Sequence, residues 1–432
     1  LNWERSEVVT LPLPTQPVRV VDADTGRPAV QQVTDVDGGQ LLFRAEGVPS
    51  VGYRVYRLEP VAAWPQSPAP RRLTGEVTIE AGDFRMVLSP EAGGIRSLQD
   101  RDGHEWVDPA AYRLGQLIDE RCSVEPWGGR VTGRTASRGG SITSAAGPLF
   151  GWAEMPVELA ELGTATLRAT WSPFRPALDI ELRIDKQACT QPQTIFMAFP
   201  FDIPNPRFRY ELPLAMAEAN ADQLPNGCRD WYAVQHVVDV SNDQLGMTWF
   251  TRDAFLVEFA DMQTNRWHRD LPLTSSAIFA NLMNNLWFTN YKLDQSGPVS
   301  FRFSLRPHRG DYVRADALRF GFEQANPLLT AAVSADQPGV LPGASGSLLS
   351  VSGPATVVLA IKAPEAGTGT VIRLFDLAGE SADRVVSLAR TVRRANLCNL
   401  VEEDLRDLPA AGTRLTVPLT ANGVATVRLD VE

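Results

Sequence analysis

Two polar and aromatic segments of the 432-residue chain carry side chains that could bind a sugar. Residues 224–232 (LPNGCRDWY) place an amide, a guanidinium, a carboxylate and aromatic rings on a turn that leads into a predicted strand. Residues 283–295 (MNNLWFTNYKLDQ) hold three asparagines, aromatic rings, a lysine and an aspartate. A pyranose presents hydroxyls at its edge and C–H groups on its faces, so amides, carboxylates and aromatic rings bind it together. The same residues could instead satisfy buried loops and fill a core, and spacing alone leaves both interpretations open.

The sequence contains no signature of a catalytic or metal site. It lacks a G-x-S-x-G elbow, a Walker A loop, a G-x-G-x-x-G motif after a strand and an H-E-x-x-H motif. The four histidines lie far apart, and none has a second His or Cys at metal-ligand spacing. We therefore assign no catalytic residue and no metal ligand. His236, on a predicted strand, is the one histidine that a sugar epimerase could recruit.

Glycoside hydrolysis uses two carboxyl groups, so neighbouring acidic residues are candidates for a catalytic pair. The run Glu402-Glu403-Asp404 is typical of a solvated turn. Asp119 and Glu120 stand beside Arg121, which favours an ion-paired loop over an acid/base pair.

The composition excludes several classes of function. A net charge of −10 argues against a nucleic-acid partner. No run of about 18 apolar residues is present, so the sequence predicts no membrane-spanning segment. The four cysteines are scattered, which indicates neither a disulfide framework nor a zinc knuckle and favours a cytoplasmic location.

The pattern of apolar residues and turns predicts an all-β protein. Short β-branched and aromatic runs predict a small β-domain at residues 1–63, and three prolines predict a stiff linker at 64–72. Strands spaced by about 8–12 residues predict a large antiparallel sandwich at 73–325, with a short connecting helix at 312–323. Strands separated by Gly-rich turns predict a terminal β-sandwich at 326–432.

Six segments together resemble the C-terminal, all-β half of the bacterial family 38 glycoside hydrolases, the α-mannosidases. They occur in the order found in that family and extend from one end of the chain to the other. They are WERSEVV (3–9), VGYRVY (51–56), PEAGGI (90–95), LPNGCRDWY (224–232) continuing to 239, MNNLWFTNYKLDQ (283–295) and FRFSLRPH (301–308).

The resemblance implies a small β-domain, a large galactose-mutarotase-like supersandwich and a terminal β-sandwich. It also implies a retaining α-mannosidase whose zinc site and catalytic carboxylates lie in an N-terminal domain that this sequence lacks. The chain begins at Leu1 without a Met, and we expect it to come from within a longer protein. Zinc is accordingly expected in the missing domain, with no cofactor in this chain.

Seven residues of the matching segments have the chemistry of sugar ligands, and we predict that they contact a carbohydrate. They are Arg229, Asp230, Tyr232, Asn284, Asn285, Asn290 and Tyr291.

The expected partners are an α-mannoside and the N-terminal catalytic domain, with no nucleic acid and no membrane; a homo-oligomer is left open. Two other functions stay open as well. The chain could be a carbohydrate-binding protein in its own right, or a sugar epimerase on the same fold.

Overall fold

A computed structural model describes residues 1–34, 39–65, 68–110, 112–124, 129–286, 292–333 and 341–432. Strands are by far the main regular structure of these residues, which confirms the all-β prediction, and the described residues contain one α-helix, α1 (Arg314–Ala325). This helix lies two residues further along the chain than predicted. Neither α1 nor any other described segment is a helix long and apolar enough to cross a membrane.

The chain divides into two compact units, one formed by Leu1–Ser67 together with Arg314–Glu432 and the other by Pro68–Val313. The first unit is discontinuous in sequence, because its N-terminal strands pair or pack with residues more than 250 positions away. The domain boundaries derived from the sequence stay a prediction.

Five antiparallel sheets make up the first unit, and all of them are small. In hydrogen-bonded order they are β1 (Arg5–Pro12), β4 (Gln40–Val48) and β3 (Gln31–Thr34); β2 (Val18–Asp22) and β6 (Tyr56–Pro60); β27 (Ser345–Ser347) and β5 (Gly52–Arg54); β28 (Leu349–Val351), β31 (Ala382–Leu388), β35 (Arg414–Leu419) and β34 (Ala410–Ala411); and β29 (Thr356–Lys362), β30 (Thr370–Asp376), β36 (Val424–Val431), β32 (Val392–Cys398) and β33 (Asp404–Asp407).

The last two of these sheets pack face to face as a sandwich. Val386 and Val417 of one sheet and Leu374 and Val427 of the other belong to one buried apolar cluster. The inward side chains alternate with outward ones, as in β35, which matches the period of two that a strand imposes.

The N-terminal residues are fixed within the first unit by side chains. Asn2 is buried, donates to the carbonyl of Thr356 (2.8 Å) and accepts from the N–H of Val358 (2.7 Å). The Trp3 indole donates to Glu323 of α1 (2.8 Å). The residues at both ends of the sequence therefore share one folded unit.

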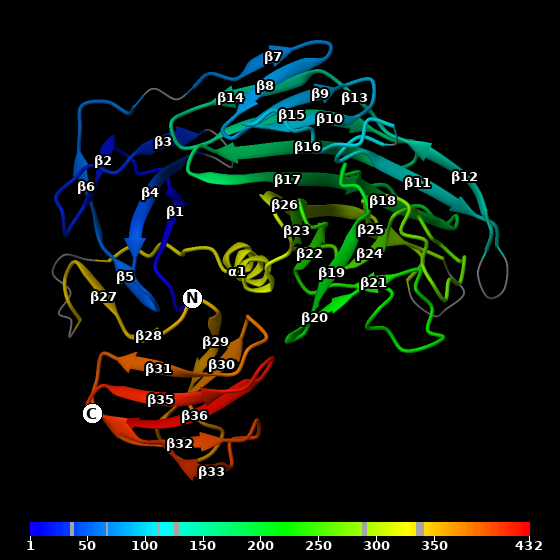
Figure 1. The fold of residues 1–432 in the computed structure, drawn as a ribbon. Helices are drawn as coiled ribbons and strands as arrows, with labels where there is room; N and C mark the ends of the chain where they lie inside the picture. Colours follow the sequence, from blue (N-terminus) through cyan, green and yellow to red (C-terminus); the bar gives the residue numbers. More distant parts are fainter. Residues whose placement is uncertain (35–38, 66–67, 111, 125–128, 287–291, 334–340) are drawn as a thin grey trace. The chain divides into compact units, whose positions relative to one another are not determined.

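Three further sheets make up the second unit (Figure 1). Their strands, in hydrogen-bonded order, are β10 (Gly94–Asp100), β9 (Phe84–Ser89) and β8 (Val77–Ala81); β12 (Val131–Ala136), β11 (Leu117–Cys122), β18 (Gln193–Phe199), β25 (Ile278–Asn284), β24 (Leu256–Phe259) and β21 (Tyr232–Ala233); and β20 (Ala215–Glu218), β19 (Arg207–Leu212), β22 (Val237–Ser241), β23 (Leu245–Thr251), β26 (Gly297–Arg309), β17 (Arg175–Lys186), β16 (Gly163–Ser172), β15 (Gly151–Glu158), β14 (Ile142–Ala146) and β7 (Arg71–Leu73), with β13 (Arg138–Gly139) paired to β15.

The six-stranded and eleven-stranded sheets enclose one large apolar core, as in the large antiparallel sandwich that the strand spacing predicts. Trp249 and Phe303 of the larger sheet contact Phe199 of the smaller one across this core. Strands β16, β17 and β26 lie side by side along the larger sheet (Figure 1).

The central strands of the six-stranded sheet, β11, β18 and β25, are buried on both faces, whereas its edge strand β12 is exposed, and this positions the site. In β18, Ile195 and Met197 face the large core, whereas Phe196 and Ala198 face a second cluster that includes Met262 and Phe279. The segment that follows β24, from residue 260 to 277, supplies Met262 to this second cluster. All seven residues of β18 are buried, and the five from Ile195 to Phe199 are apolar, as expected for a strand covered on both faces.

Candidate functional site

Asp230 precedes β21, and its side chain is completely buried. Oδ2 accepts a hydrogen bond from the backbone N–H of Trp267 (2.7 Å), and Oδ1 accepts one from the backbone N–H of His268 (2.9 Å). The His268 Nδ1 also lies 3.0 Å from Oδ1. A buried carboxylate needs such donors, because losing water without replacement would be very costly. Asp230 therefore holds residues 267 and 268 against the start of β21.

Arg229 holds the same segment from its other side. Its backbone N–H donates to the carbonyl of His268 (2.9 Å), and its buried guanidinium donates to both the carbonyl and the side-chain oxygen of Asn220 (2.9 and 3.1 Å). An ion pair with Asp270 (3.3 Å) completes its contacts among the described residues, although the Asp270 side chain is 92% exposed. The two neighbouring charged residues thus clamp the 267–270 segment.

Tyr232 lies in the large core of the second unit rather than at a surface. Its ring packs against Tyr210 and Phe259, with ring centroids 5.2 and 4.5 Å apart. Burial raises the pKa of this phenol, and its hydroxyl has no hydrogen-bond partner among the described residues. Contact between Tyr232 and a sugar stays a prediction.

Asn285 joins three backbone groups in the interior. Its Oδ1 accepts from the N–H of Gln193 (2.7 Å), and its Nδ2 donates to the carbonyls of Cys189 (2.9 Å) and Leu293 (3.2 Å). Asn284 is the last residue of β25 and is half-buried. Asn290 and Tyr291 lie outside the described residues. The sugar-contact role of all four stays a prediction.

Trp267, which the sequence analysis did not single out, is the most exposed tryptophan of the described residues. The side chain is 60% exposed, and its backbone has a φ of +58°. This left-handed conformation is rare for a bulky residue. The contacts of Asp230 described above hold it in place. The sequence carried a signal that could have found it: residues 263–270 (QTNRWHRD) combine amides, guanidinium groups, a carboxylate and an aromatic ring, as residues 224–232 do.

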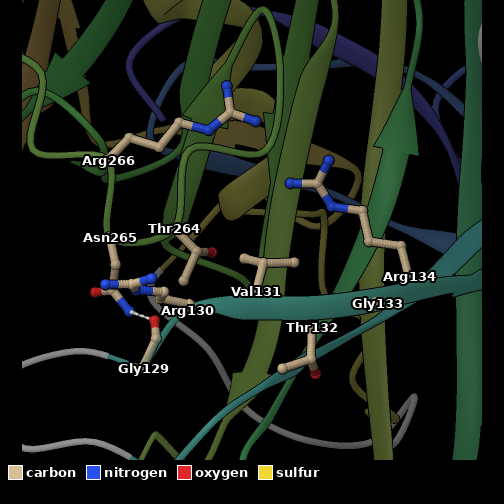
Figure 2. A pocket seen from close by; sticks show the side chains of 9 residues that line it. All are labelled: Gly129, Arg130, Val131, Thr132, Gly133, Arg134, Thr264, Asn265 and Arg266. Carbon is tan, nitrogen blue, oxygen red and sulfur yellow. Dashed lines mark hydrogen bonds between the residues drawn. The ribbon is translucent and has the colours of Figure 1, made fainter.

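A polar hollow of about 690 Å³ lies between the start of β12 and the 264–266 segment, which Trp267 follows in sequence. Figure 2 shows its lining side chains, and the Nδ2 of Asn265 donates to the carbonyl of Gly129 (2.9 Å) to join the two walls. The side chains with polar groups are Arg130, Thr132, Arg134, Thr264, Asn265 and Arg266.

Two acidic residues are paired with the arginines of the hollow. Glu120 of β11 is fully buried and accepts from Nε of Arg134 (2.7 Å). Asp261 pairs with Arg266 (3.0 Å) and lies 4.0 Å from Arg134. The ion pairing expected around Asp119 and Glu120 is therefore present, but both residues lie on a strand and not in a loop.

Glu258 lies beneath the segment that carries Trp267. Its side chain is fully buried, one oxygen accepts from the N–H of Gln263, and Oε1 has no hydrogen-bond partner among the described residues. Burial, together with the nearby charge of Glu120, raises the pKa of Glu258 well above 4.5. Glu258 has no exposed surface and does not line any wall of the hollow described above, so it acts as a support for the loop.

The described residues contain no group of three or more His, Cys, Asp or Glu side chains that could hold a metal ion. His236 lies 3.3 Å from Glu211, which also accepts from the N–H of Val237 (3.2 Å). His308 lies 3.0 Å from the buried Asp239. These histidines are thus paired with carboxylates inside the fold.

Comparisons with known proteins show what the chain is similar to. Residues 355–427 match the family described as "Glycosyl hydrolases family 38 C-terminal beta sandwich domain". Its terminal sandwich is thus similar to that of the family 38 glycoside hydrolases. The matched segment contains most of the terminal sandwich, including β29, β30 and β32.

Curated relatives match a limited part of the chain. Alpha-mannosidase 2C1 of Homo sapiens is 33% identical, and that of Mus musculus 31% identical, over 110 residues. These residues are 25% of this chain and 10% of each relative.

A crystal structure of an α-mannosidase from Enterococcus faecalis V583 matches with a TM-score of 0.72 and 15% identity. The match covers 99% of this chain and 55% of that one. At this identity the likeness shows the fold alone, and it confirms that the all-β architecture is the one found in part of that α-mannosidase. The chain spans about half the length of that protein.

Proposed function

We propose that this chain is the C-terminal region of a retaining family 38 α-mannosidase, that it supports the catalytic cleft and contributes carbohydrate contacts, and that it is inactive alone. The observation that carries the proposal is the match of 99% of the chain to 55% of the E. faecalis α-mannosidase. The family 38 match at residues 355–427 supports it independently, because it comes from sequence.

The chemistry of the described residues agrees with this division of labour. The fully buried carboxylates Asp230, Glu258 and Glu120 are used in hydrogen bonds or ion pairs within the fold. A retaining glycosidase instead needs two carboxyl groups facing the scissile bond. Zinc does not fit the described residues either, so we assign it to the N-terminal part of the parent protein and derive no step through it.

A second candidate function is carbohydrate binding by this chain in its own right. The polar hollow, whose 264–266 wall precedes the exposed Trp267 in sequence, favours it, because such a hollow is accessible without any further domain. A cytoplasmic location and a homo-oligomer stay predictions in either case.

Turnover of an α-mannoside tests the proposal. The purified chain and the longer parent protein are assayed side by side with an aryl α-mannoside, each with and without added zinc. We expect turnover by the parent and none by the chain. Turnover by the purified chain would refute its assignment as a non-catalytic region, and a parent without α-mannosidase activity would refute the family assignment of its reaction.

A further inference from the structure

We propose that the hollow between β12 and residues 264–266 binds an anionic saccharide, a sugar that carries a carboxylate or a phosphate, and that the Trp267 indole stacks on its ring. The inference deepens the proposed function and rests on it for the choice of a sugar as the ligand. The charge of the ligand and the position of the site come from this chain alone.

The charge balance of the hollow favours an anion. Three guanidinium groups line it, from Arg130, Arg134 and Arg266, against the carboxylates of Glu120 and Asp261. Within the described part of the chain, the exposed Arg130 side chain has no hydrogen bond or ion pair. The arginines thus outnumber these carboxylates by one. The extra positive charge is that of Arg130, whose side chain would break no interaction with another described residue on turning toward a ligand. Guanidinium groups bind carboxylate and phosphate through two parallel hydrogen bonds.

A buried hydroxyl group provides a second, independent indication of a ligand. Thr264 lines the hollow and is only 4% exposed, and its Oγ1 has no hydrogen-bond partner among the described residues. A buried hydroxyl without a partner is unfavourable, and native proteins have few of them. An oxygen atom of a ligand in the hollow would supply the missing partner.

Trp267 provides the apolar contact that a sugar needs. It follows Arg266 directly, and consecutive Cα atoms are about 3.8 Å apart, so its backbone lies next to the wall of the hollow. The ring is 60% exposed although the backbone is held at a φ of +58° by the Asp230 carboxylate. Residues held in unfavourable backbone conformations concentrate at functional sites, and an exposed indole face stacks on the C–H face of a pyranose.

The test is a calorimetric titration of the chain with four ligands: mannose, inorganic phosphate, mannose 6-phosphate and glucuronic acid. We expect at least one of the two anionic sugars to bind about tenfold or more tightly than mannose and than inorganic phosphate, because a charge-assisted contact adds to the stacking contact. Binding of the sugar phosphate or of the uronic acid alone would support the proposal and identify the anionic group. The affinity should fall as salt is added.

Three variants locate the site. Arg130→Gln and Arg266→Gln remove a charge and keep a hydrogen-bonding side chain, and Trp267→Asn removes the ring with a residue that tolerates a positive φ. Each is expected to weaken binding about tenfold. Arg393→Gln and Phe174→Asn, at exposed positions outside the hollow, are the matched controls and should bind as the unchanged chain does.

The proposal would be overturned if neither anionic sugar bound at about 10 mM, because a dissociation constant above that value means no useful affinity. It would also be overturned if mannose bound as tightly as mannose 6-phosphate, or if inorganic phosphate did. Unchanged binding in the three variants would overturn it as well. None of these outcomes affects the turnover of the parent protein. Conversely, failure of the α-mannosidase assignment leaves the titration of this chain interpretable.

Discussion

The buried carboxylate of Asp230 accepts a hydrogen bond of 2.7 Å from the backbone N–H of Trp267, 37 residues further along the chain. The same group receives the backbone N–H of His268. One interior carboxylate thus determines the backbone position of an exposed tryptophan. In this structure Asp230 supports Trp267, which follows the 264–266 wall of the hollow in sequence, and direct contact of Asp230 with a sugar stays a prediction.

Replacing Asp230 should destabilise the second unit. Asp230→Ala leaves the two backbone N–H groups without their acceptor, and we expect a loss of about 2–3 kcal/mol in the free energy of unfolding. Asp270→Ala is the control, because its exposed carboxylate should contribute less than about 1 kcal/mol. Urea unfolding measures both. Equal losses in the two variants would show that the Asp230 contacts are not the cause.

Removing the Trp267 side chain should have the opposite effect on stability. Trp267→Gly removes the cost of a positive φ, which is about 1–2 kcal/mol for a bulky residue. Glycine also loses more backbone entropy on folding, which costs about 0.5–1 kcal/mol. We therefore expect a net gain of between about 0 and 1.5 kcal/mol. Phe174→Gly, at an exposed aromatic residue without a positive φ, should lose stability. A loss at position 267 as large as that at position 174 would argue against strain.

Asn285 is expected to act through the fold. Asn285→Ala removes one acceptor and one donor that serve three backbone groups, and we expect a loss of about 2–3 kcal/mol in urea unfolding. Asn285→Asp keeps the acceptor for Gln193 but places an oxygen against the carbonyls of Cys189 and Leu293. It should be at least as destabilising near neutral pH and less so in acid, where the carboxyl becomes a donor. A harmless alanine substitution would contradict this account.

Glu258 should make stability depend on pH. Because burial raises its pKa above 4.5, the folded protein retains this proton where the unfolded chain has lost it. The free energy of unfolding therefore falls as the pH rises from about 4.5 toward the higher folded-state pKa. Glu258→Gln removes this dependence and can still accept from Gln263, so the variant should gain stability over the unchanged chain between about pH 5 and pH 8.

Urea unfolding at both pH values measures the Glu258 effect. Glu91→Gln, at an exposed position, should show the pH dependence of the unchanged chain. A difference between Glu258→Gln and the unchanged chain that is constant across pH would contradict the assignment to this carboxyl group.

The strands could be predicted from sequence because each follows from local spacing. Segment 224–232 could be noticed for the same reason, since its unusual residues are neighbours. The partners of Asp230 and Arg229 could not be predicted, because they are the backbone groups of residues 267 and 268, brought close by tertiary structure. A polar residue in a turn has the same sequence signature whether it binds a ligand or a backbone group.

The hollow could not be predicted from the sequence for a related reason. Its walls come from β12 and from a segment about 130 residues later, and only the six-stranded sheet brings them together. The exposure of Trp267 also depends on its backbone conformation, which the buried Asp230 imposes. Local composition could have marked residues 263–270, but not the direction in which the indole points.

We propose above that these residues belong to a larger α-mannosidase. The most direct test is to deplete extracts of the source cells with an antibody raised to this chain, and to measure both the mass of the captured protein and the α-mannosidase activity left behind. We expect the antibody to remove the α-mannosidase activity together with a protein whose mass is well above 47.3 kDa. Capture of a 47.3 kDa protein alone, with the activity left in the extract, would contradict it.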